Sequence, residues 1–316
     1  MAANANLHKA KNEKNDEFYT QLTDVAEELK HYKEHFKDKI VFCNCDDPTW
    51  SAFWKYFHLN FTKLGLRKLI STHYDKNEPT YKMEYEGGDD NNIEVGTITQ
   101  LDGNGDFRNK ECLDLLDECD IVVTNPPFSL FREYVKTLME HGKKFVIIGN
   151  MNCITYKEIF PLIKNNEVWM GPSITSGDRK FNVPDDYPLK ASGCGIDEDG
   201  RKFIRVKGVR WFTNIDHAKR HEKLVLWKHY MHEDYLKFDH YDAINVDKTK
   251  DIPVDYDGVM GVPITFLDKY CPEQFEIING IGRYACIDAD YVNPIGTYGT
   301  DINGKHTYFR VLIRRR

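Results

Sequence analysis

The sequence Ile121-Val122-Val123-Thr124-Asn125-Pro126-Pro127-Phe128 predicts a buried strand that ends in a rigid turn. Three β-branched apolar residues in a row are typical of a parallel strand covered on both faces. The two prolines stop the strand, because proline cannot donate a ladder hydrogen bond and restricts the residue before it. An amphipathic helix is expected to follow from Ser129, with Gly142 just past its end. Its apolar face consists of Leu130, Phe131, Tyr134, Val135, Leu138 and Met139.

This turn places an amide and an aromatic ring where open α/β sheets bind their ligands, at the carboxyl end of a strand. The side-chain oxygen of Asn125 and the carbonyl oxygen of Pro126 can each accept one hydrogen bond from an NH2 group. The ring of Phe128 can stack on a planar ligand. The turn therefore suits a planar base that carries an exocyclic amine.

Asn125-Pro126-Pro127-Phe128 in this setting resembles the catalytic motif of S-adenosylmethionine-dependent amino-group methyltransferases. Further stretches make the chain resemble, more narrowly, the EcoRI-type adenine-specific (N6) DNA methyltransferases. These stretches are Asn15-Asp16-Glu17-Phe18-Tyr19-Thr20, Cys45-Asp46-Asp47-Pro48, Gly105-Asp106-Phe107, Arg210-Trp211-Phe212-Thr213-Asn214 and Gly261-Val262-Pro263-Ile264-Thr265-Phe266-Leu267-Asp268-Lys269-Tyr270. The resemblance runs from about residue 12 to the C-terminus. It implies a class I methyltransferase fold, with a Rossmann-like, mostly parallel sheet covered by helices on both faces.

Composition sets wide bounds on the class of protein. A chain of 316 residues can form one large α/β domain with a smaller appendage. No apolar run approaches the roughly 20 residues that span a bilayer, and the polar N-terminus lacks the apolar core of a signal peptide. We therefore expect a cytoplasmic protein that makes no membrane contact.

The eight cysteines are scattered through apparent strands and helices, which favours structural thiols over disulfides. Cys43-Asn44-Cys45 has no Cys/His partner pair at zinc-ligand spacing, so no metal is expected. The net charge of −7 argues against a protein coated for nucleic acid, although an enzyme needs only one basic face. Basic residues gather at 201–210 and 310–316, and each stretch could equally be an ordinary solvated surface.

The first strand is expected at 39–45, and it ends in Asp46-Asp47-Pro48. Asp47 suits the N-cap and Pro48 the first position of a helix over about 48–64. The glycine-rich turn of most nucleotide sites is missing, as expected for a cofactor without phosphates. Asp46 is a candidate partner for a cationic or hydroxyl group of S-adenosylmethionine, with a capping role as the alternative.

The second strand is expected at 66–72, followed by Asp75, which could accept hydrogen bonds from ribose hydroxyls or simply lie in a loop. Residues 76–104 predict a surface hairpin, with short alternating runs at 81–85 and 94–99. The resemblance implies that Asp106 accepts from the cofactor adenine amine and that Phe107 packs beside that ring. A glycine turn carrying a solvated aspartate is the alternative.

A helix is expected at 23–36, with Thr23 as its N-cap. The resemblance places the segment before it against the methionine part of the cofactor; its residues are Phe18, Tyr19 and Thr20. A hydrophobic staple for the helix is the alternative.

Beyond the central motif, the pattern predicts a strand at 144–149, a helix at 155–165 and a short strand at 168–171. Residues 172–189 are rich in turn formers and predict a long loop. Runs at 193–196 and 202–206 flank Asp197-Glu198-Asp199-Gly200, a hairpin signal, and 209–215 is expected to complete the sheet. We expect six basic side chains of this region to bind DNA: Lys180, Arg201, Lys202, Arg205, Lys207 and Arg210.

The expected organisation is a flexible arm at 1–14, a catalytic domain at 15–215 with insertions at about 76–104 and 172–208, and a target-recognition region at 216–316 that ends in a strand at 307–313. The expected activity is transfer of the methyl group of S-adenosylmethionine to N6 of an adenine flipped out of double-stranded DNA, with Asn125, Pro126, Pro127 and Phe128 as the catalytic residues. One chain carries all the motifs, so we expect a monomer, with a restriction endonuclease as a potential functional partner. Methylation of an RNA base or a protein glutamine, and an inactive nucleic-acid-binding domain, are the alternatives.

Overall fold

The computed structural model describes residues 19–76, 78–185, 187–189, 193–282 and 300–316. The arm expected at 1–14 lies outside these ranges. The chain divides into two compact units, which are described separately. Unit 1 is Met1–Met151 with Gly171–Asp216, and unit 2 is Asn152–Met170 with His217–Arg316.

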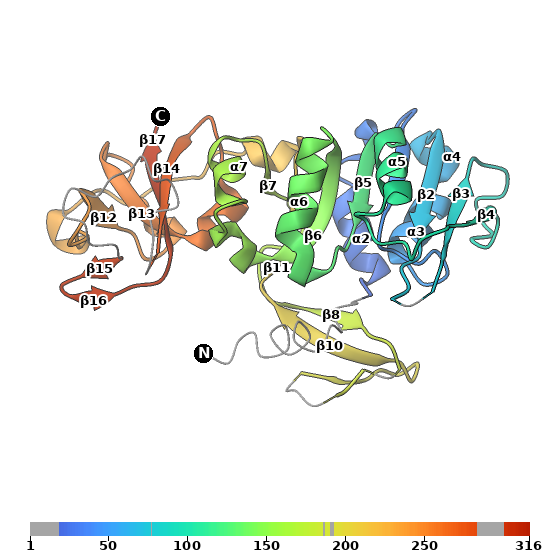
Figure 1. The fold of residues 1–316 in the computed structure, drawn as a ribbon. Coiled ribbons are helices and arrows are strands. Elements are labelled where there is room, and N and C mark those ends of the chain that lie inside the picture. The colour runs from blue at the N-terminus through green and yellow to red at the C-terminus, as the bar shows by residue number, and fades with distance from the viewer. Residues whose placement is uncertain (1–18, 77, 186, 190–192, 283–299) are drawn as a thin grey trace. The chain divides into compact units, whose positions relative to one another are not determined.

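Unit 1 is built on a twisted sheet whose centre is parallel (Figure 1). Its strands are β1 (Ile40–Cys43), β2 (Lys68–Thr72), β3 (Tyr81–Tyr85), β4 (Thr97–Gln100), β5 (Ile121–Thr124), β6 (Lys144–Asn150) and β11 (Val209–Thr213). They follow the order β4-β3-β2-β1-β5-β6-β11. β1 is parallel to both β2 and β5, and β5 is parallel to β6, whereas β3, β4 and β11 are antiparallel to their neighbours. From β1 the chain passes to β2 on one side of β1 and later forms β5 on the other side. The strand order therefore reverses between β1 and β5, which makes a topological switch point there.

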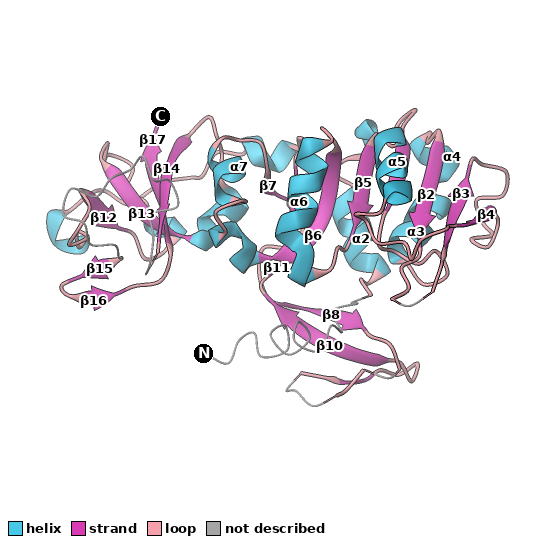
Figure 2. Ribbon diagram, in the orientation of Figure 1, coloured by secondary structure: helices cyan, strands magenta, loops and turns pink. Residues whose placement is uncertain are grey.

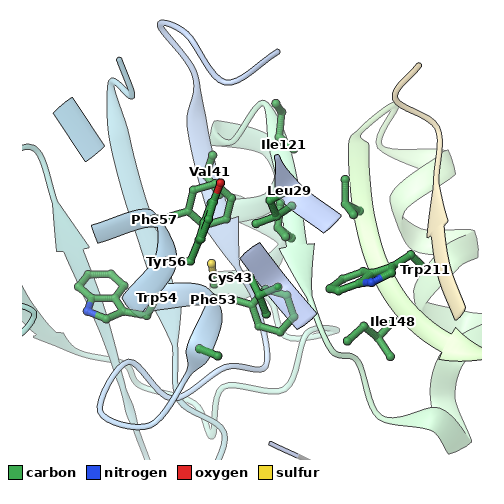
Figure 3. Close-up of a cluster of buried hydrophobic side chains, with 14 of the residues drawn as sticks. Leu29, Val41, Cys43, Phe53, Trp54, Tyr56, Phe57, Ile121, Ile148 and Trp211 are labelled. Carbon is green, nitrogen blue, oxygen red and sulfur yellow. The ribbon is translucent and has the colours of Figure 1, made fainter. Parts of the chain in front are cut away.

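Helices cover both faces of this sheet (Figure 2), as in a class I methyltransferase fold. They are α2 (Leu22–Leu29), α3 (Ala52–Leu59), α4 (Phe61–Leu64), α5 (Lys110–Glu118) and α6 (Phe131–Glu140). Alternate strand residues serve opposite faces, because successive side chains of a strand point to opposite sides. Val41 and Cys43 pack with Leu29 of α2 and Phe53 of α3 (Figure 3). On the other face, the ring of Phe212 in β11 meets Phe131 of α6 at a centroid distance of 4.9 Å.

Unit 1 contains a second, smaller sheet. This sheet shows that the prediction of a long loop over 172–189 was wrong. Residues 178–182 form β8 (Asp178–Asn182), which pairs antiparallel with β10 (Lys202–Lys207), and β10 pairs with β9 (Gly195–Ile196). The hairpin expected around 197–200 is confirmed. The local sequence of 172–189 is rich in turn-forming residues and did not predict β8. This strand forms through its pairing with β10, about twenty residues further along the chain.

The start expected for the helix after β1 was also wrong. α3 begins at Ala52, and its N-cap is Ser51, whose hydroxyl accepts from the backbone N–H groups of Phe53 (3.1 Å) and Trp54 (3.2 Å). Asp47 instead accepts from Thr49 within the preceding turn. The helix breaks at Asn60 before α4, so the continuous helix over 48–64 is not formed.

The other helices are shorter than their patterns suggest. α2 has Gln21, not Thr23, at its N-cap, and its last expected turn is the 3-10 helix η1 (Lys33–His35). A 3-10 turn, η2 (Phe128–Leu130), precedes α6, and Gly142 (φ +62°) follows its end as expected. The helix expected at 155–165 is reduced to α7 (Phe160–Lys164), after η3 (Met151–Thr155).

Unit 2 contains a sheet in the order β12-β13-β17-β14 and a short β15–β16 hairpin. These strands are β12 (Ala243–Asn245), β13 (Val259–Pro263), β14 (Phe275–Ile281), β15 (Asp301–Ile302), β16 (Lys305–His306) and β17 (Arg310–Arg315). The unit also holds β7 (Trp169–Met170), α7, most of η3 and the 3-10 turns η4 (Ala218–His221), η5 (His232–Asp234), η6 (Thr249–Asp251) and η7 (Ile264–Lys269). Part of its core is formed by Phe238, Tyr241 and Leu312.

Candidate active site

The turn after β5 has the form expected from its sequence. β5 is fully buried, and the chain leaves it through Asn125 and the buried Pro126. Pro127 (φ −54°, ψ 123°) caps η2, and its carbonyl oxygen accepts from the N–H of Leu130 at 2.9 Å. Phe128 is half-buried and packs against the buried core of unit 1. The structure thus brings the four motif residues together at the carboxyl edge of the sheet.

Asp46, at the end of β1, lies directly beside this turn. Its carboxylate accepts from the hydroxyl of Thr124, from the N–H of Asn125 (3.4 Å) and from the hydroxyl of Ser51 (3.2 Å). Burial raises the pKa of the Asp46 carboxyl to about 7, although these hydrogen bonds act in the opposite direction. The carboxylate therefore joins the β1 and β5 loops across the switch point, and Ser51, not Asp46, caps α3.

Asp47, which the sequence suggested only as a helix cap, belongs to a polar cluster at the ends of β1 and β2. It accepts from the hydroxyl of Tyr81 at 2.9 Å, and its other oxygen lies 3.6 Å from Nε2 of His73. Nδ1 of His73 lies 2.6 Å from the hydroxyl of Thr80. Burial, together with the nearby Asp47, raises the pKa of Tyr81 to about 12. The sequence placed His73 at the carboxyl end of the second strand but gave neither His73 nor Tyr81 a role, because the hairpin pattern at 81–85 did not show where β3 returns.

Asp75 and the loop of Asp106 are tied to one another through the backbone. The N–H of Asp75 donates to the carbonyl oxygen of Asn104 at 3.0 Å, and a carboxylate oxygen of Asp75 accepts from the N–H of Glu78 at 3.2 Å. Gly105 has φ +75°, and a Cβ added there would lie 2.0 Å from the carbonyl oxygen of His73. Only glycine fits this close approach. The structure therefore holds the loop of Asp106 against the end of β2.

The side chains of Asp106 and Phe107 already have close neighbours. Both carboxylate oxygens of Asp106 accept from the guanidinium of Arg108, at 2.8 and 2.6 Å, and this pairing lowers the pKa of the Asp106 carboxyl. Phe107 is 3 % exposed, and its ring meets that of Tyr134 in α6 at a centroid distance of 4.9 Å. Oδ1 of Asp106 also accepts from the backbone N–H of Arg108 at 3.0 Å, so Oδ2 is the oxygen that retains a second lone pair for a ligand.

The segment before α2 contributes Tyr19 and the half-buried Thr20, whereas Phe18 lies outside the described residues. Tyr19 exchanges two backbone hydrogen bonds with Asn182 of β8, at 2.9 and 3.1 Å. Its ring is stacked on that of Trp50, with centroids 6.0 Å apart and planes 6° apart. Trp50 follows the Asp46-Asp47 turn, so this segment lies beside the same edge of the sheet.

The expected DNA-binding residues separate into two groups. Arg205 and Lys207 of β10 are exposed, and Lys180 of β8 lies directly opposite Arg205 in the register. The charged groups of Lys180 and Arg205 lie 4.8 and 6.0 Å from the ring centroid of Phe203. Arg201 is exposed at the hairpin turn, where it pairs with Asp199.

Two of the expected residues are held by backbone carbonyl groups. Lys202 is half-buried and donates to the carbonyl oxygen of Tyr187 at 3.1 Å. Arg210 is only 3 % exposed, and its guanidinium donates to the carbonyl oxygens of Val209 and Thr175, both at 2.8 Å. The structure does not bring Arg210 to the surface with the others.

The described ranges include seven of the eight cysteines. There, no group of three or more His, Cys, Asp or Glu side chains is arranged to hold a metal ion. None of the cysteines in the same ranges forms a disulfide. No helix within them is both long enough and apolar enough to cross a bilayer.

The chain is similar to known methyltransferases over nearly its whole length. Residues 6–316 match the family model described as adenine-specific methyltransferase EcoRI. The chain is 47% identical over 329 residues to the type II methyltransferase M.EcoRI of Escherichia coli, covering 100% of this chain and 98% of the relative. It is 38% identical to the type II methyltransferase M.MpnI of Mycoplasma pneumoniae and 37% identical to M.MgeORF184P of Mycoplasma genitalium, with 98% of each chain covered. No solved structure matched.

Replacement of Gly105 by alanine is expected to destabilise unit 1 more than the same change at Gly200. Both glycines have positive φ (+75° and +79°), so both variants carry the cost of about 1–2 kcal/mol for a side chain in the left-handed region. Only Gly105→Ala adds a clash with His73, because nothing lies within 4 Å of a Cβ at Gly200. Urea unfolding measures both losses, and equal losses would contradict the close approach described here.

The raised pKa of Asp46 predicts a dependence of stability on pH. The ordinary aspartate pKa is 3.8, so between about pH 4 and 7 the folded chain holds a proton that the unfolded chain has lost. Stability should therefore fall as the pH rises through this window, by at most roughly 4 kcal/mol for a shift of about three units.

Asp46→Asn serves as the comparison for this prediction, since it keeps the shape but cannot ionise. The difference in free energy of unfolding between the variant and the wild type should shift in favour of the variant from pH 4.5 to pH 7.5. Other groups that titrate in this range are common to both proteins, so they cancel in the difference. A constant difference across the range would show that Asp46 titrates as an ordinary aspartate.

Proposed function

The chain belongs to the EcoRI family of adenine-specific methyltransferases and is a DNA adenine methyltransferase; from that premise we propose how its residues carry out the reaction. The acceptor is the exocyclic N6 of an adenine extruded from duplex DNA, and the methyl donor is S-adenosylmethionine. The observation that carries this proposal is the turn Asn125-Pro126-Pro127-Phe128 at the switch point of the sheet, fastened to Asp46.

Asn125 and Pro126 act on the target amine. The amine of adenine is a weak nucleophile because its lone pair is delocalised into the ring. The side-chain oxygen of Asn125 and the carbonyl oxygen of Pro126 each accept a hydrogen bond from one N–H of this amine. Together they favour the pyramidal nitrogen that forms during attack. The two prolines hold these acceptors in place before the substrate arrives. No general base is needed before attack, since the proton becomes acidic only as the new bond forms.

The residues at the carboxyl edge suit S-adenosylmethionine, which when bound supplies an electrophilic methyl group on a sulfonium centre. This ligand carries hydroxyl, amine and cationic groups, which carboxylates recognise, and no phosphate. We assign Asp75 to the ribose hydroxyls, Asp106 to the adenine amine and Asp46 to a cationic or hydroxyl group. Phe107 supports the Asp106 loop from its buried position beside the adenine site, and the methionine part lies against Phe18, Tyr19 and Thr20.

Phe128 is assigned to the extruded base. A base that leaves the duplex loses its stacking partners. Stacking on an aromatic side chain can take their place and contributes about 1–3 kcal/mol to binding of the base. Phe128 packs against the core but is only half-buried, which supports this assignment.

A direct assay tests the acceptor class. Labelled methyl transfer from S-adenosylmethionine is measured side by side on duplex DNA, RNA and protein. The proposal requires transfer to adenine N6 in duplex DNA. Preferential labelling of an RNA base or of protein glutamine, with the same Asn125 dependence, would replace DNA as the substrate.

We assign DNA contacts to the small β8–β10–β9 sheet through Lys180, Arg201, Arg205 and Lys207, and not through Lys202, whose ammonium donates to the carbonyl oxygen of Tyr187. Arg205 and Lys207 support this assignment most directly, because both are exposed on one face of β10. Arg210 takes no part in it, because its guanidinium is buried against carbonyl oxygens.

Target recognition is assigned to residues 216–316, since the described residues proposed for chemistry all lie in unit 1. A single chain carries the full set of motifs, so we propose a monomer, and light scattering of the complex with DNA checks this. The proposed functional partner is a restriction endonuclease, which DNA methylated by this enzyme should resist.

Asn125→Ala is expected to reduce methyl transfer by about 100- to 1000-fold, the usual loss when an oriented transition-state acceptor is removed. Binding of S-adenosylmethionine should stay within about tenfold of wild type, because Asn125 faces the target amine. Asp106→Ala is the matched comparison and should mainly weaken cofactor binding. Single-turnover rates and calorimetry separate the two effects, and near-normal turnover in Asn125→Ala would remove the mechanism.

The double variant Arg205→Gln/Lys207→Gln is expected to weaken DNA binding and flatten its salt dependence. Each lost phosphate contact lowers the slope of log K against log salt by about one. The control is Lys110→Gln/Lys136→Gln, which removes the same charge from two exposed lysines of α5 and α6. Identical slopes for the two double variants would make the β10 face an ordinary solvated surface.

A further inference from the structure

Strand β8 has two faces with different surroundings. Its register with β10 places Lys180 opposite Arg205 and Phe181 opposite Ile204. Because successive side chains of a strand point to opposite sides, Lys180 lies on the basic face while Phe181 points into the core. Phe181 and Ile204 are 2 % and 0 % exposed. A single strand therefore connects the face assigned to DNA with the interior of unit 1.

On the core side, Phe181 meets the aromatic ring of the catalytic motif. The ring centroids of Phe181 and Phe128 are 6.4 Å apart, and the planes cross at 88°. This is an edge-to-face pair at a favourable separation. A phenylalanine ring otherwise turns readily about its last side-chain bond. An edge-to-face neighbour restricts that rotation and hence sets the plane in which Phe128 can receive a base.

β8 is fastened on the side opposite β10 as well. Asn182 exchanges backbone hydrogen bonds with Tyr19, and its side-chain oxygen accepts from Nε2 of Gln21 at 2.8 Å. The side-chain nitrogen Nδ2 of Asn182 donates to the carboxylate of Asp197 at 3.2 Å. The same carboxylate forms an ion pair with Lys180 at 3.0 Å. Phe181 thus sits on a strand whose position is set by the segment before α2 and by the hairpin turn.

From these contacts we infer that Phe181 is a positioning residue for methyl transfer: it holds the ring of Phe128 in the orientation that receives the extruded adenine. The inference rests on the proposed function of Phe128. It also links β8 to DNA binding, because Lys180 of the same strand lies on the face assigned to DNA.

Phe181→Leu tests the inference, because leucine stays apolar but lacks the ring edge. Aromatic pairs contribute beyond their buried area, so we expect a loss of about 3- to 10-fold in the single-turnover rate of methyl transfer. The fluorescence gain of a duplex with 2-aminopurine at the target adenine should fall in parallel, while affinity for S-adenosylmethionine stays unchanged. The target adenine is found by mapping the bases that wild type methylates in plasmid DNA.

Val206→Ala is the matched control, since Val206 is 3 % exposed, belongs to the same core and has no ring. Both variants should lower the melting temperature, and only Phe181→Leu should lower the rate and the fluorescence gain. Phe181→Tyr retains the ring edge and should recover most of the rate. Should Phe181→Leu fail to fold, Phe181→Met takes its place.

A double variant decides whether Phe181 acts through Phe128. If it does, Phe181→Leu adds little to the loss already caused by Phe128→Leu. Losses that multiply, or equal rates for Phe181→Leu and Val206→Ala, overturn the positioning role. Wild type acts as the separate check of the proposed function: methylation without a fluorescence gain removes base extrusion itself, whereas a gain that Phe181→Leu leaves intact removes only the inference.

Discussion

The carboxylate of Asp46 is the contact on which the site depends. β1 and β5 are neighbours in the sheet but 80 residues apart in the chain. Asp46 joins the loops that follow these strands by accepting from the hydroxyl of Thr124 and the N–H of Asn125. A carboxylate taken from water is costly unless donors surround it, and here three donors offset part of that cost. The part of the cost that is not offset raises the pKa of the Asp46 carboxyl to about 7.

Rigid backbone contacts extend this arrangement along the edge of the sheet. Pro126 and Pro127 fix the direction of the chain after β5, and the close approach of Gly105 to His73 fixes the loop that carries Asp106. The acceptors proposed for the target amine and for the cofactor are therefore held by the backbone before either ligand binds. Such preorganisation is how an enzyme stabilises developing charge without first reorganising its groups.

The charge of the chain is divided according to the chemistry of its proposed ligands. Carboxylates of Asp46, Asp47, Asp75 and Asp106 gather at the carboxyl edge, where a cationic cofactor without phosphates is proposed to bind. Exposed basic side chains lie on one face of β10, in a chain whose net charge is −7. A protein can therefore be acidic overall and still present a local basic surface to DNA.

Several features could be predicted from the sequence because they depend on near neighbours. The run of β-branched residues before Asn125 predicted a buried strand, the prolines predicted its end, and turn signals predicted the hairpins at 81–99 and 193–206. These patterns repeat with the period of a strand or a helix, so a few adjacent residues suffice to reveal them. The resemblance of the motifs also led to the right family and activity.

The tertiary structure decided the features that depend on contacts between distant parts of the chain. Arg210 has the same charge as Arg205, yet it is buried, because every residue of β11 is buried whereas β10 exposes Arg205 and Lys207. The strand β8 was not predicted, because its sequence favours turns and its pairing with β10 is what makes it a strand. Asp47 failed to cap α3 because Tyr81, brought in by β3, and the Thr49 turn occupy its carboxylate. The sequence by itself determined which local elements form and which chemistry they carry, whereas long-range register and burial decided which side chains meet.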